Sequence, residues 1–267
     1  MSAIVGYLIG SISFSRLVLR LKAPGKDISD LAVAVEGTDE AAPVKVYGAN
    51  AASMILGTKY GIGIGILDML KAAAPMLVFR FFVYPNSFTY LAVSVGALMG
   101  HNWPVYYRFR GGRGFSVIFG SFVIIDWFGS IIEPVFGIML GMFIVRNIMF
   151  AYSSWLWLLP VWFWFRVTSD SALFLVFYSI IIILIFTIAT IPEIKTVARY
   201  RREGKLGEYQ ISLFDSSPRW RGMKSMQDKI QGLGKQGYFL GVVFAVLFII
   251  VLINLQYLPT WIQLTLP

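Results

Sequence analysis

Residues 171–191 read SALFLVFYSIIIILIFTIATI, a run of twenty-one residues with no charged side chain. As an α-helix this stretch is roughly 30 Å long, which matches the hydrocarbon core of a bilayer. Similar apolar runs recur along the 267-residue chain, of which 57% is hydrophobic and only 14% charged. A soluble protein of this size cannot bury so much apolar surface, so the sequence predicts an integral membrane protein.

The predicted fold is all-α, a polytopic helical membrane bundle with about seven or eight transmembrane helices. The predicted spans are 2–20, 60–82, 87–101, 115–131, 134–150, 153–167, 171–191 and 237–257. Charged residues and a proline interrupt the apolar runs at Asp126, Glu133 and Pro160, so the boundaries near them can shift by several residues. We expect a membrane domain over 1–236 and an additional C-terminal transmembrane helix within 237–267.

Lys and Arg residues gather between the predicted spans, and their distribution predicts the orientation. Six lie in 16–59, three in 108–113 and ten in 195–235. With eight spans these segments and Arg146 share one side of the membrane. The positive-inside rule then predicts a multi-pass protein of the cell (inner) membrane with both termini outside. It places in the cytoplasm the loops 21–58, 101–114 and 192–236. Because the basic residues flank apolar spans, we expect them to meet anionic membrane lipids and no nucleic acid.

Two of these loops are long enough to carry structure of their own. We expect residues 21–47 to be irregular or weakly folded, and residues 193–205 to extend the preceding helix as a basic amphipathic segment. The chain has no cysteine and one histidine, His101, so we predict no metal site. No internal repeat is visible, so the inverted-repeat architecture of many transporters has no support.

Residues 100–114, GHNWPVYYRFRGGRG, join two predicted spans on the cytoplasmic side. The glycines let backbone amides approach an anion closely, and the helix expected to follow points its positive end at the same place. The arginines add planar forks that suit phosphate oxygens. The pattern predicts a phosphate site, and the alternative is a tight turn whose arginines only set topology. The residues predicted to contact phosphate are Gly111, Gly112, Arg113, Gly114 and Arg110.

The same stretch resembles the signature loop of the membrane-integral glycerol-3-phosphate acyltransferases, which use acyl phosphate as donor. That loop reads His-x-x-Pro-Val, then four residues, then Arg-Gly-Gly-Arg-Gly. Residues 7–14, YLIGSISF, resemble the family's first-helix Gly-Ser-Ile-Pro-Phe, and residues 67–71, LDMLK, match its Leu-Asp-x-x-Lys. Asp68 and Lys71 lie on one helix face, where we expect them to pair. The pair is either purely structural or supports the loops of the site.

Two further motifs of the family are matched in part. Its first cytoplasmic loop, Gly-Ser-Gly-Asn-Pro-Gly-Ala-Thr-Asn followed by an arginine, resembles residues 48–50, GAN, but Met54 stands where an ungapped alignment puts the arginine. Its third motif, His-x-x-Asn-Ile-x-Arg-Leu, falls on residues 193–200, EIKTVARY, which keep the arginine as Arg199 and lack the histidine and asparagine. The resemblance covers roughly residues 1–205.

The resemblance implies an enzyme that moves a fatty acyl group from acyl phosphate to glycerol 3-phosphate, giving lysophosphatidate for phospholipid biosynthesis. It implies no cofactor and no covalent acyl-enzyme. Arg113 and Asn50 are the expected catalytic residues, the first at the donor phosphate and the second positioning the acceptor. Arg110 and Arg199 supplement the charge. His101 lines the substrate site or, alternatively, is a helix-end residue bonded to the backbone.

Two other functions remain open from the sequence. One is a non-catalytic or repurposed relative that binds an anionic lipid or acyl phosphate, which the altered acceptor-side motifs favour. The other is a small transporter, suggested by charged Asp68 and Lys71 at membrane depth. Acyl-chain length and oligomeric state are not predicted by the sequence.

Overall fold

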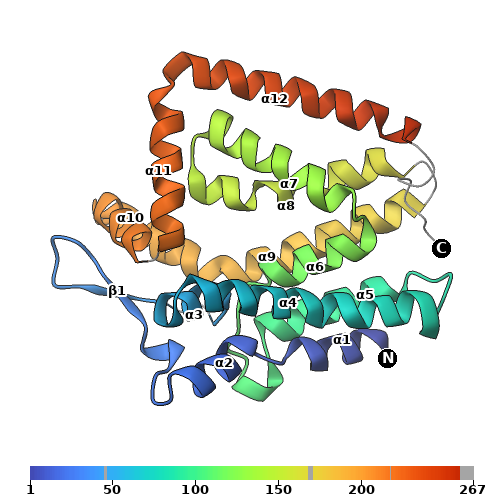
Figure 1. The fold of residues 1–267 in the computed structure, drawn as a ribbon, viewed down its shortest axis with the longest axis horizontal. Coiled ribbons are helices and arrows are strands. Elements are labelled where there is room, and N and C mark those ends of the chain that lie inside the picture. The colour runs from blue at the N-terminus through green and yellow to red at the C-terminus, as the bar shows by residue number, and fades with distance from the viewer. Residues whose placement is uncertain (45–46, 168–170, 217, 259–267) are drawn as a thin grey trace. The chain divides into compact units, whose positions relative to one another are not determined.

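The structure, a computed structural model, describes residues 1–44, 47–167, 171–216 and 218–258 (Figure 1). It is built almost entirely of α-helices, which confirms the predicted all-α class. The longer helices are α1 Ser2–Gly10, α2 Phe14–Lys22, α3 Ala49–Leu56, α4 Thr58–Val78, α5 Thr89–Asn102, α6 Phe115–Ile125, α7 Gly129–Leu140, α8 Ile148–Arg166, α9 Ser171–Arg202, α10 Leu206–Asp215, α11 Pro218–Gly232 and α12 Gly234–Asn254. The short elements are η1 Ile28–Asp30, β1 Ala32–Ala34, β2 Ala41–Pro43, η2 Phe79–Val83, η3 Val105–Tyr107, η4 Gly141–Val145 and η5 Leu255–Tyr257.

Several helices are long and apolar enough to cross a bilayer. Within the described ranges these are Ser2–Lys22, Thr58–Val83, Ile148–Arg166, Ser171–Arg202 and Gly234–Tyr257. Shorter apolar helices occupy Phe115–Ile125 and Gly129–Val145, and α5 supplies the remaining predicted span. Each predicted span therefore overlaps a helix, in a multi-pass membrane protein, although spans 115–131 and 134–150 include non-helical residues at 126–128 and 146–147. The first span is interrupted between α1 and α2, at residues 11–13. The last nine residues of the predicted C-terminal segment lie outside the described part of the chain.

The break between α6 and α7 comes earlier in the chain than predicted. Asp126 ends α6, and its Oδ1 accepts a hydrogen bond from the N–H of Gly129, the first residue of α7, at 3.0 Å. Its Oδ2 lies 2.9 Å from both Arg166 Nε and Trp162 Nε1. A carboxylate side chain that accepts from a backbone N–H at the start of the next helix favours a turn there over continuation of the preceding helix. Glu133 has no such role and lies inside α7, so the boundary predicted there is wrong.

Packing divides the chain into two compact units. The first comprises Met1–Ser121 and Leu184–Gly222, and the second Phe122–Ile183 and Met223–Pro267. In the first unit α1, α4 and α5 pack together with α2 and α3, and in the second α7, α8 and α12 pack together. Every residue predicted to belong to the functional site lies in the first unit.

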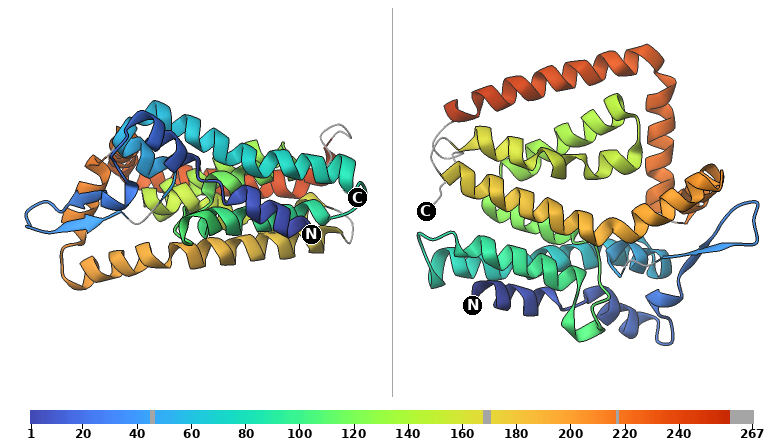
Figure 2. Two further views of the ribbon diagram at one scale, coloured as in Figure 1. Left: turned by 90° about the horizontal axis from the view of Figure 1, so that it is seen from below. Right: turned by 180° about the vertical axis from the view of Figure 1, so that it is seen from behind.

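Helices α1 and α5 run side by side in the first unit (Figures 1 and 2). Small residues spaced four apart allow this approach: Gly6 and Gly10 on α1, Gly96 and Gly100 on α5. A Cβ at Gly10 would strike the Ala97 carbonyl, and a Cβ on the facing glycines would likewise meet backbone. This pattern is how helices associate closely in lipid. It brings the end of α5 against the chain that follows α1.

Residues 21–47 were expected to be irregular, and the described part of this segment is ordered instead. Strands β1 and β2 pair antiparallel, with Val33 opposite Ala42. Two hydrogen bonds hold the hairpin against α10. Glu36 N donates to Ser212 Oγ on α10 at 2.9 Å, and Lys205 Nζ, just before α10, donates to Glu40 Oε1 at 2.9 Å. The bond from Lys205 lowers the pKa of the Glu40 carboxyl. The ion pair is therefore present at neutral pH and is lost as pH falls through that lowered pKa.

The prediction that the helix continues past the apolar run is confirmed as far as Arg202. Helix α9 runs without interruption from Ser171 to Arg202 and passes through Pro192. Its last turns carry Arg199, Arg201 and Arg202. The basic segment is therefore a continuation of the apolar helix, and Glu193 lies where the apolar run ends.

Candidate phosphate site at the glycine-rich loop

A buried cation on α4 organises the base of the candidate site. The Lys71 ammonium lies 2.9 Å from Asp68 Oδ1, 2.9 Å from the Ile12 carbonyl and 2.8 Å from His101 Nδ1. Three acceptors thus surround a group with three donors and no acceptor. Asp68 and Lys71 are buried, as the spacing of their motif leads one to expect. The ammonium joins α4, the end of α5 and the chain after α1.

His101 links this cation to the glycine-rich loop, residues 110–114. Because an ammonium only donates hydrogen bonds, Nδ1 accepts and the ring carries its proton on Nε2. The His101 carbonyl accepts a hydrogen bond from Gly112 N at 3.0 Å. A Cβ on Gly112 would strike Nε2 of the ring, so the loop lies directly against the imidazole. His101 is therefore a buried support behind the loop, in contact with both Lys71 and Gly112.

The loop is also held from the side of α2 and the chain before α3. Tyr47 N donates to the Gly111 carbonyl at 3.2 Å, and Arg16 Nη2 donates to the Arg110 carbonyl at 2.6 Å. The Arg16 guanidinium stacks on the rings of Tyr47 and Tyr107, at 4.2 and 4.6 Å from their centroids. Contacts on two sides therefore fix the backbone conformation of the loop.

The backbone is unusual just before this loop and at its last residue. Arg108 and Phe109 both have positive φ, 51° and 59°, a conformation that costs non-glycine residues energy. Gly114 has φ 79° just before α6 begins, and a Cβ there would strike the Leu98 side chain. Beside it lies buried Asn102, whose side-chain N and O have no hydrogen-bond partner among the described residues. The loop is thus held in one strained shape at a helix N-terminus.

The Arg113 side chain extends from the loop to α9. Its Nε donates to Glu193 Oε2 at 2.9 Å, and its Nη2 contacts Glu193 Oε1. Its Nη1 donates to the Gly112 carbonyl at 3.3 Å. The guanidinium fork therefore holds an oxyanion in a two-point arrangement, the geometry by which arginine binds a phosphate. Here the oxyanion is the carboxylate of the protein itself.

The other predicted site residues are distributed less favourably. Asn50 lies in the first turn of α3, where its carbonyl accepts from Ser53 Oγ at 2.7 Å. Arg110 is exposed. Arg199 lies over the Tyr200 ring and 3.9 Å from Glu203. It is six residues beyond Glu193, roughly 9 Å along α9. The structure thus brings His101, the loop glycines and Arg113 together, and gives Asn50 and Arg199 no direct contact with them among the described residues.

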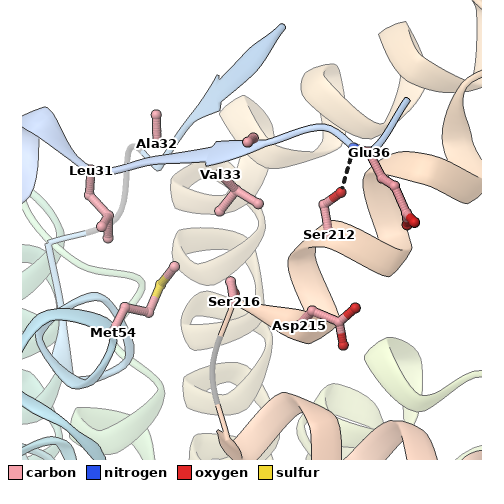
Figure 3. Close-up of a pocket in the computed structure, with 9 residues that line it drawn as sticks. Leu31, Ala32, Val33, Glu36, Met54, Ser212, Asp215 and Ser216 are labelled. Carbon is pink, nitrogen blue, oxygen red and sulfur yellow. Dashed lines mark hydrogen bonds between the residues drawn. The ribbon is translucent and has the colours of Figure 1, made fainter. Parts of the chain in front are cut away.

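An open pocket of about 480 Å³ lies beside the hairpin (Figure 3). Its lining residues are Leu31, Ala32, Val33, Ala34, Glu36, Met54, Ser212, Asp215 and Ser216. Two carboxylates and no Lys or Arg line it, so it does not suit a phosphate. Met54 lies on its wall, at the place where the family pattern has an arginine. The phosphate-binding candidate remains the loop. Among the described residues, no group of three or more His, Asp or Glu is arranged to hold a metal.

Three residues that support or contact the loop had no role in the sequence-based prediction. Glu193 was noted only as departing from the family's histidine, Arg16 only as a topogenic cation, and Asn102 only as part of the loop motif. Charge complementarity between Glu193 and Arg113 was visible, but these residues are eighty positions apart. Only the packing of α9 in the first unit brings them together.

Fold and loop together define a multi-pass helical membrane protein in which a loop bearing Arg113, packed on His101, is a candidate anion site at a helix N-terminus. The family model for glycerol-3-phosphate acyltransferase matches residues 1–200. The chain belongs to the glycerol-3-phosphate acyltransferase family, and the predicted membership is confirmed.

Individual relatives agree with this assignment. A glycerol-3-phosphate acyltransferase 1 of Dehalococcoides mccartyi is 26% identical over 187 residues, which is 64% of this chain and 79% of that protein. One from Oceanobacillus iheyensis is 30% identical over 134 residues, 47% of this chain and 58% of that protein. The chain thus spans little more than half of this second relative.

The fold is also similar to a solved structure. The crystal structure of PlsY (YgiH), an integral membrane glycerol 3-phosphate acyltransferase, in its glycerol 3-phosphate form, superposes with a TM-score of 0.58. It is 24% identical, and the match covers 75% of this chain and 92% of that one. The lysophosphatidic acid form gives a TM-score of 0.57. At this identity the comparison shows that the helical fold is shared.

Proposed function

We propose that this protein transfers a fatty acyl group from acyl phosphate to a hydroxyl of glycerol 3-phosphate, releasing phosphate and forming lysophosphatidate. One observation carries the proposal: a glycine-rich loop bearing Arg113 is packed on His101, which is itself fixed by Lys71. Such a loop offers a two-point cation and a helix N-terminus to one phosphate group. Family membership supplies the matching chemistry.

The chemistry asks little of the protein beyond positioning. The acceptor hydroxyl oxygen forms a bond to the acyl carbon while the bond from that carbon to the phosphate oxygen breaks. The hydroxyl proton passes to the departing phosphate, which leaves as hydrogen phosphate, and a preorganised cation at the loop stabilises the negative charge that develops on it. We assign the donor phosphate to Gly111–Gly114 and Arg113, with Arg110 adding charge nearby. We assign Asn50 to the acceptor side and Arg199 to supplementing the charge, although neither contacts the loop directly among the described residues.

The direct test is an acyl-transfer assay on purified protein in detergent, with acyl phosphate and labelled glycerol 3-phosphate. We expect labelled lysophosphatidate with acyl phosphate, and much less with acyl-CoA, which has no phosphate bonded to the acyl carbon. Product from acyl-CoA alone would contradict the assigned donor. No product from either donor would leave a non-catalytic relative that binds acyl phosphate.

The site also requires an orientation in the membrane. We propose that the protein lies in the inner membrane of the cell and that loops 21–58, 101–114 and 192–236 face the cytoplasm. Both proposed substrates can reach the site from that aqueous side. The distribution of Lys and Arg supports this, since twenty of the 23 lie on that side with eight spans.

Cysteine accessibility measures this orientation without background, because the chain contains no cysteine. Single cysteines at exposed Ser29, Tyr106 and Ser225 are expected to react with an impermeant thiol reagent only after cells are permeabilised. A cysteine at exposed Asn86, on the opposite side, is expected to react in intact cells and is the matched control. The reverse pattern would invert the topology.

A further inference from the structure

Glu193 occupies the edge of Arg113 that a phosphate would use. The carboxylate faces Nε and Nη2 together, with Nε to Oε2 at 2.9 Å. This is the edge through which arginine makes two parallel hydrogen bonds to a phosphate. The third nitrogen, Nη1, is turned to the Gly112 carbonyl. An incoming anion therefore meets Glu193 before it can bind this fork at two points.

The exposure of the pair decides whether an anion can displace Glu193. The side chains of Arg113 and Glu193 are 18% and 32% exposed, whereas those of Arg166 and Asp126 are each 1% exposed. Ion pairs in contact with solvent contribute little to stability, while breaking a buried pair costs several times more. The contact between Arg113 and Glu193 is therefore one that a ligand can open. The pair formed by Arg166 and Asp126 is not.

The carboxylate also comes from a different element than the loop. Glu193 follows Pro192 inside α9, whereas Arg113 is on the segment before α6. A proline inside a helix removes one backbone hydrogen bond at this point of α9. The loop itself is held independently, by His101, Tyr47 and Arg16. Loss of the Glu193 contact therefore leaves the backbone of the phosphate cradle in place.

We propose that Glu193 is a built-in anionic occupant of the donor-phosphate site, which the phosphate group of the donor displaces from Arg113. Glu193 is thus a specificity-determining residue that weakens anion binding and sets the donor concentration at which the site fills. The inference rests on the proposed function for its physiological ligand. Its physical content, competition between a carboxylate and a phosphate for one guanidinium, holds for inorganic phosphate as well.

The test is the affinity of the purified protein for inorganic phosphate, measured by titration calorimetry in detergent. Glu193→Gln keeps the size of the side chain and removes its charge, and is expected to tighten phosphate binding about threefold to tenfold. Glu40→Gln removes one negative charge from another solvent-exposed ion pair, with Lys205, and is expected to leave affinity unchanged. It controls for the change in net charge.

A second background separates competition from a general effect. In Arg113→Ala protein, Glu193→Gln is expected to change phosphate affinity no further, because the contested cation is gone. If the Gln variant fails to fold, Glu193→Ala takes its place. Unchanged or weaker phosphate binding in folded Glu193→Gln protein, or no measurable binding to wild type and variant alike, would overturn the inference. Tighter binding without acyl transfer would refute the proposed function and leave this inference standing.

Discussion

Replacing Lys71 with methionine is expected to lower the free energy of unfolding by about 3–5 kcal/mol, the cost of breaking a buried ion pair from one side. The change leaves the Asp68 carboxylate unpaired inside the protein, and it takes the donor from His101 Nδ1 and from the Ile12 carbonyl. Lipid or protein interior offers no water to replace these contacts. Thermal unfolding in detergent measures the loss.

The double variant separates pairing from general damage. Asp68→Asn alone should also destabilise the protein, whereas Asp68→Asn with Lys71→Met should cost less than the sum of the two. Lys59→Met, at an exposed position on the same helix, is the control and should change stability little. Simple additivity in the cycle would show that Asp68 and Lys71 do not stabilise each other.

Gly112→Ala is expected to lower kcat/KM for acyl phosphate about 100-fold while the protein still folds. The added Cβ would fall on Nε2 of His101, and the ring cannot retreat freely because Nδ1 is 2.8 Å from Lys71. The loop has to move instead, and a displacement of about 1 Å at a reacting group costs on the order of 100-fold in rate. Overpacking itself costs about 1–3 kcal/mol of stability.

Gly207→Ala is the matched control, because a Cβ at Gly207 meets nothing within 4 Å. Transfer rates of the two variants, compared at equal amounts of folded protein, test the claim. Wild-type kcat/KM in Gly112→Ala protein would mean that the contact between loop and imidazole has no part in donor positioning.

Much of the fold follows from local sequence. Apolar runs of bilayer length predict helices because every backbone group in lipid has to be paired within its own segment. Short-range spacing likewise predicted the pair formed by Asp68 and Lys71. Helix ends were less predictable, since Asp126 and Glu133 are both acidic and only the three-dimensional contact with Gly129 shows which of them ends a helix.

The candidate site was predictable where it is continuous in sequence, over residues 110–114. Its supports come from distant segments: Arg16, Lys71 and Glu193 reach the loop or its neighbour His101 from α2, α4 and α9. Those contacts depend on packing, such as the close approach of α1 and α5 through their glycines. A sequence motif identifies the residues of such a candidate site, but it does not show which side chains from distant segments, such as Glu193, contact them.

Binding of acyl phosphate to wild-type and Arg113→Ala protein tests most directly the claim that the glycine-rich loop is the donor-phosphate site. Removing the fork should weaken acyl phosphate binding by about tenfold to a hundredfold, for the loss of a charge-assisted contact. Arg113→Lys keeps the charge and loses the fork, so its affinity for acyl phosphate should lie between those of wild-type and Arg113→Ala protein. Affinity for glycerol 3-phosphate should change much less in both variants. Unchanged acyl phosphate affinity in folded Arg113→Ala protein would contradict the account and leave Gly111–Gly114 a turn whose arginine only sets topology.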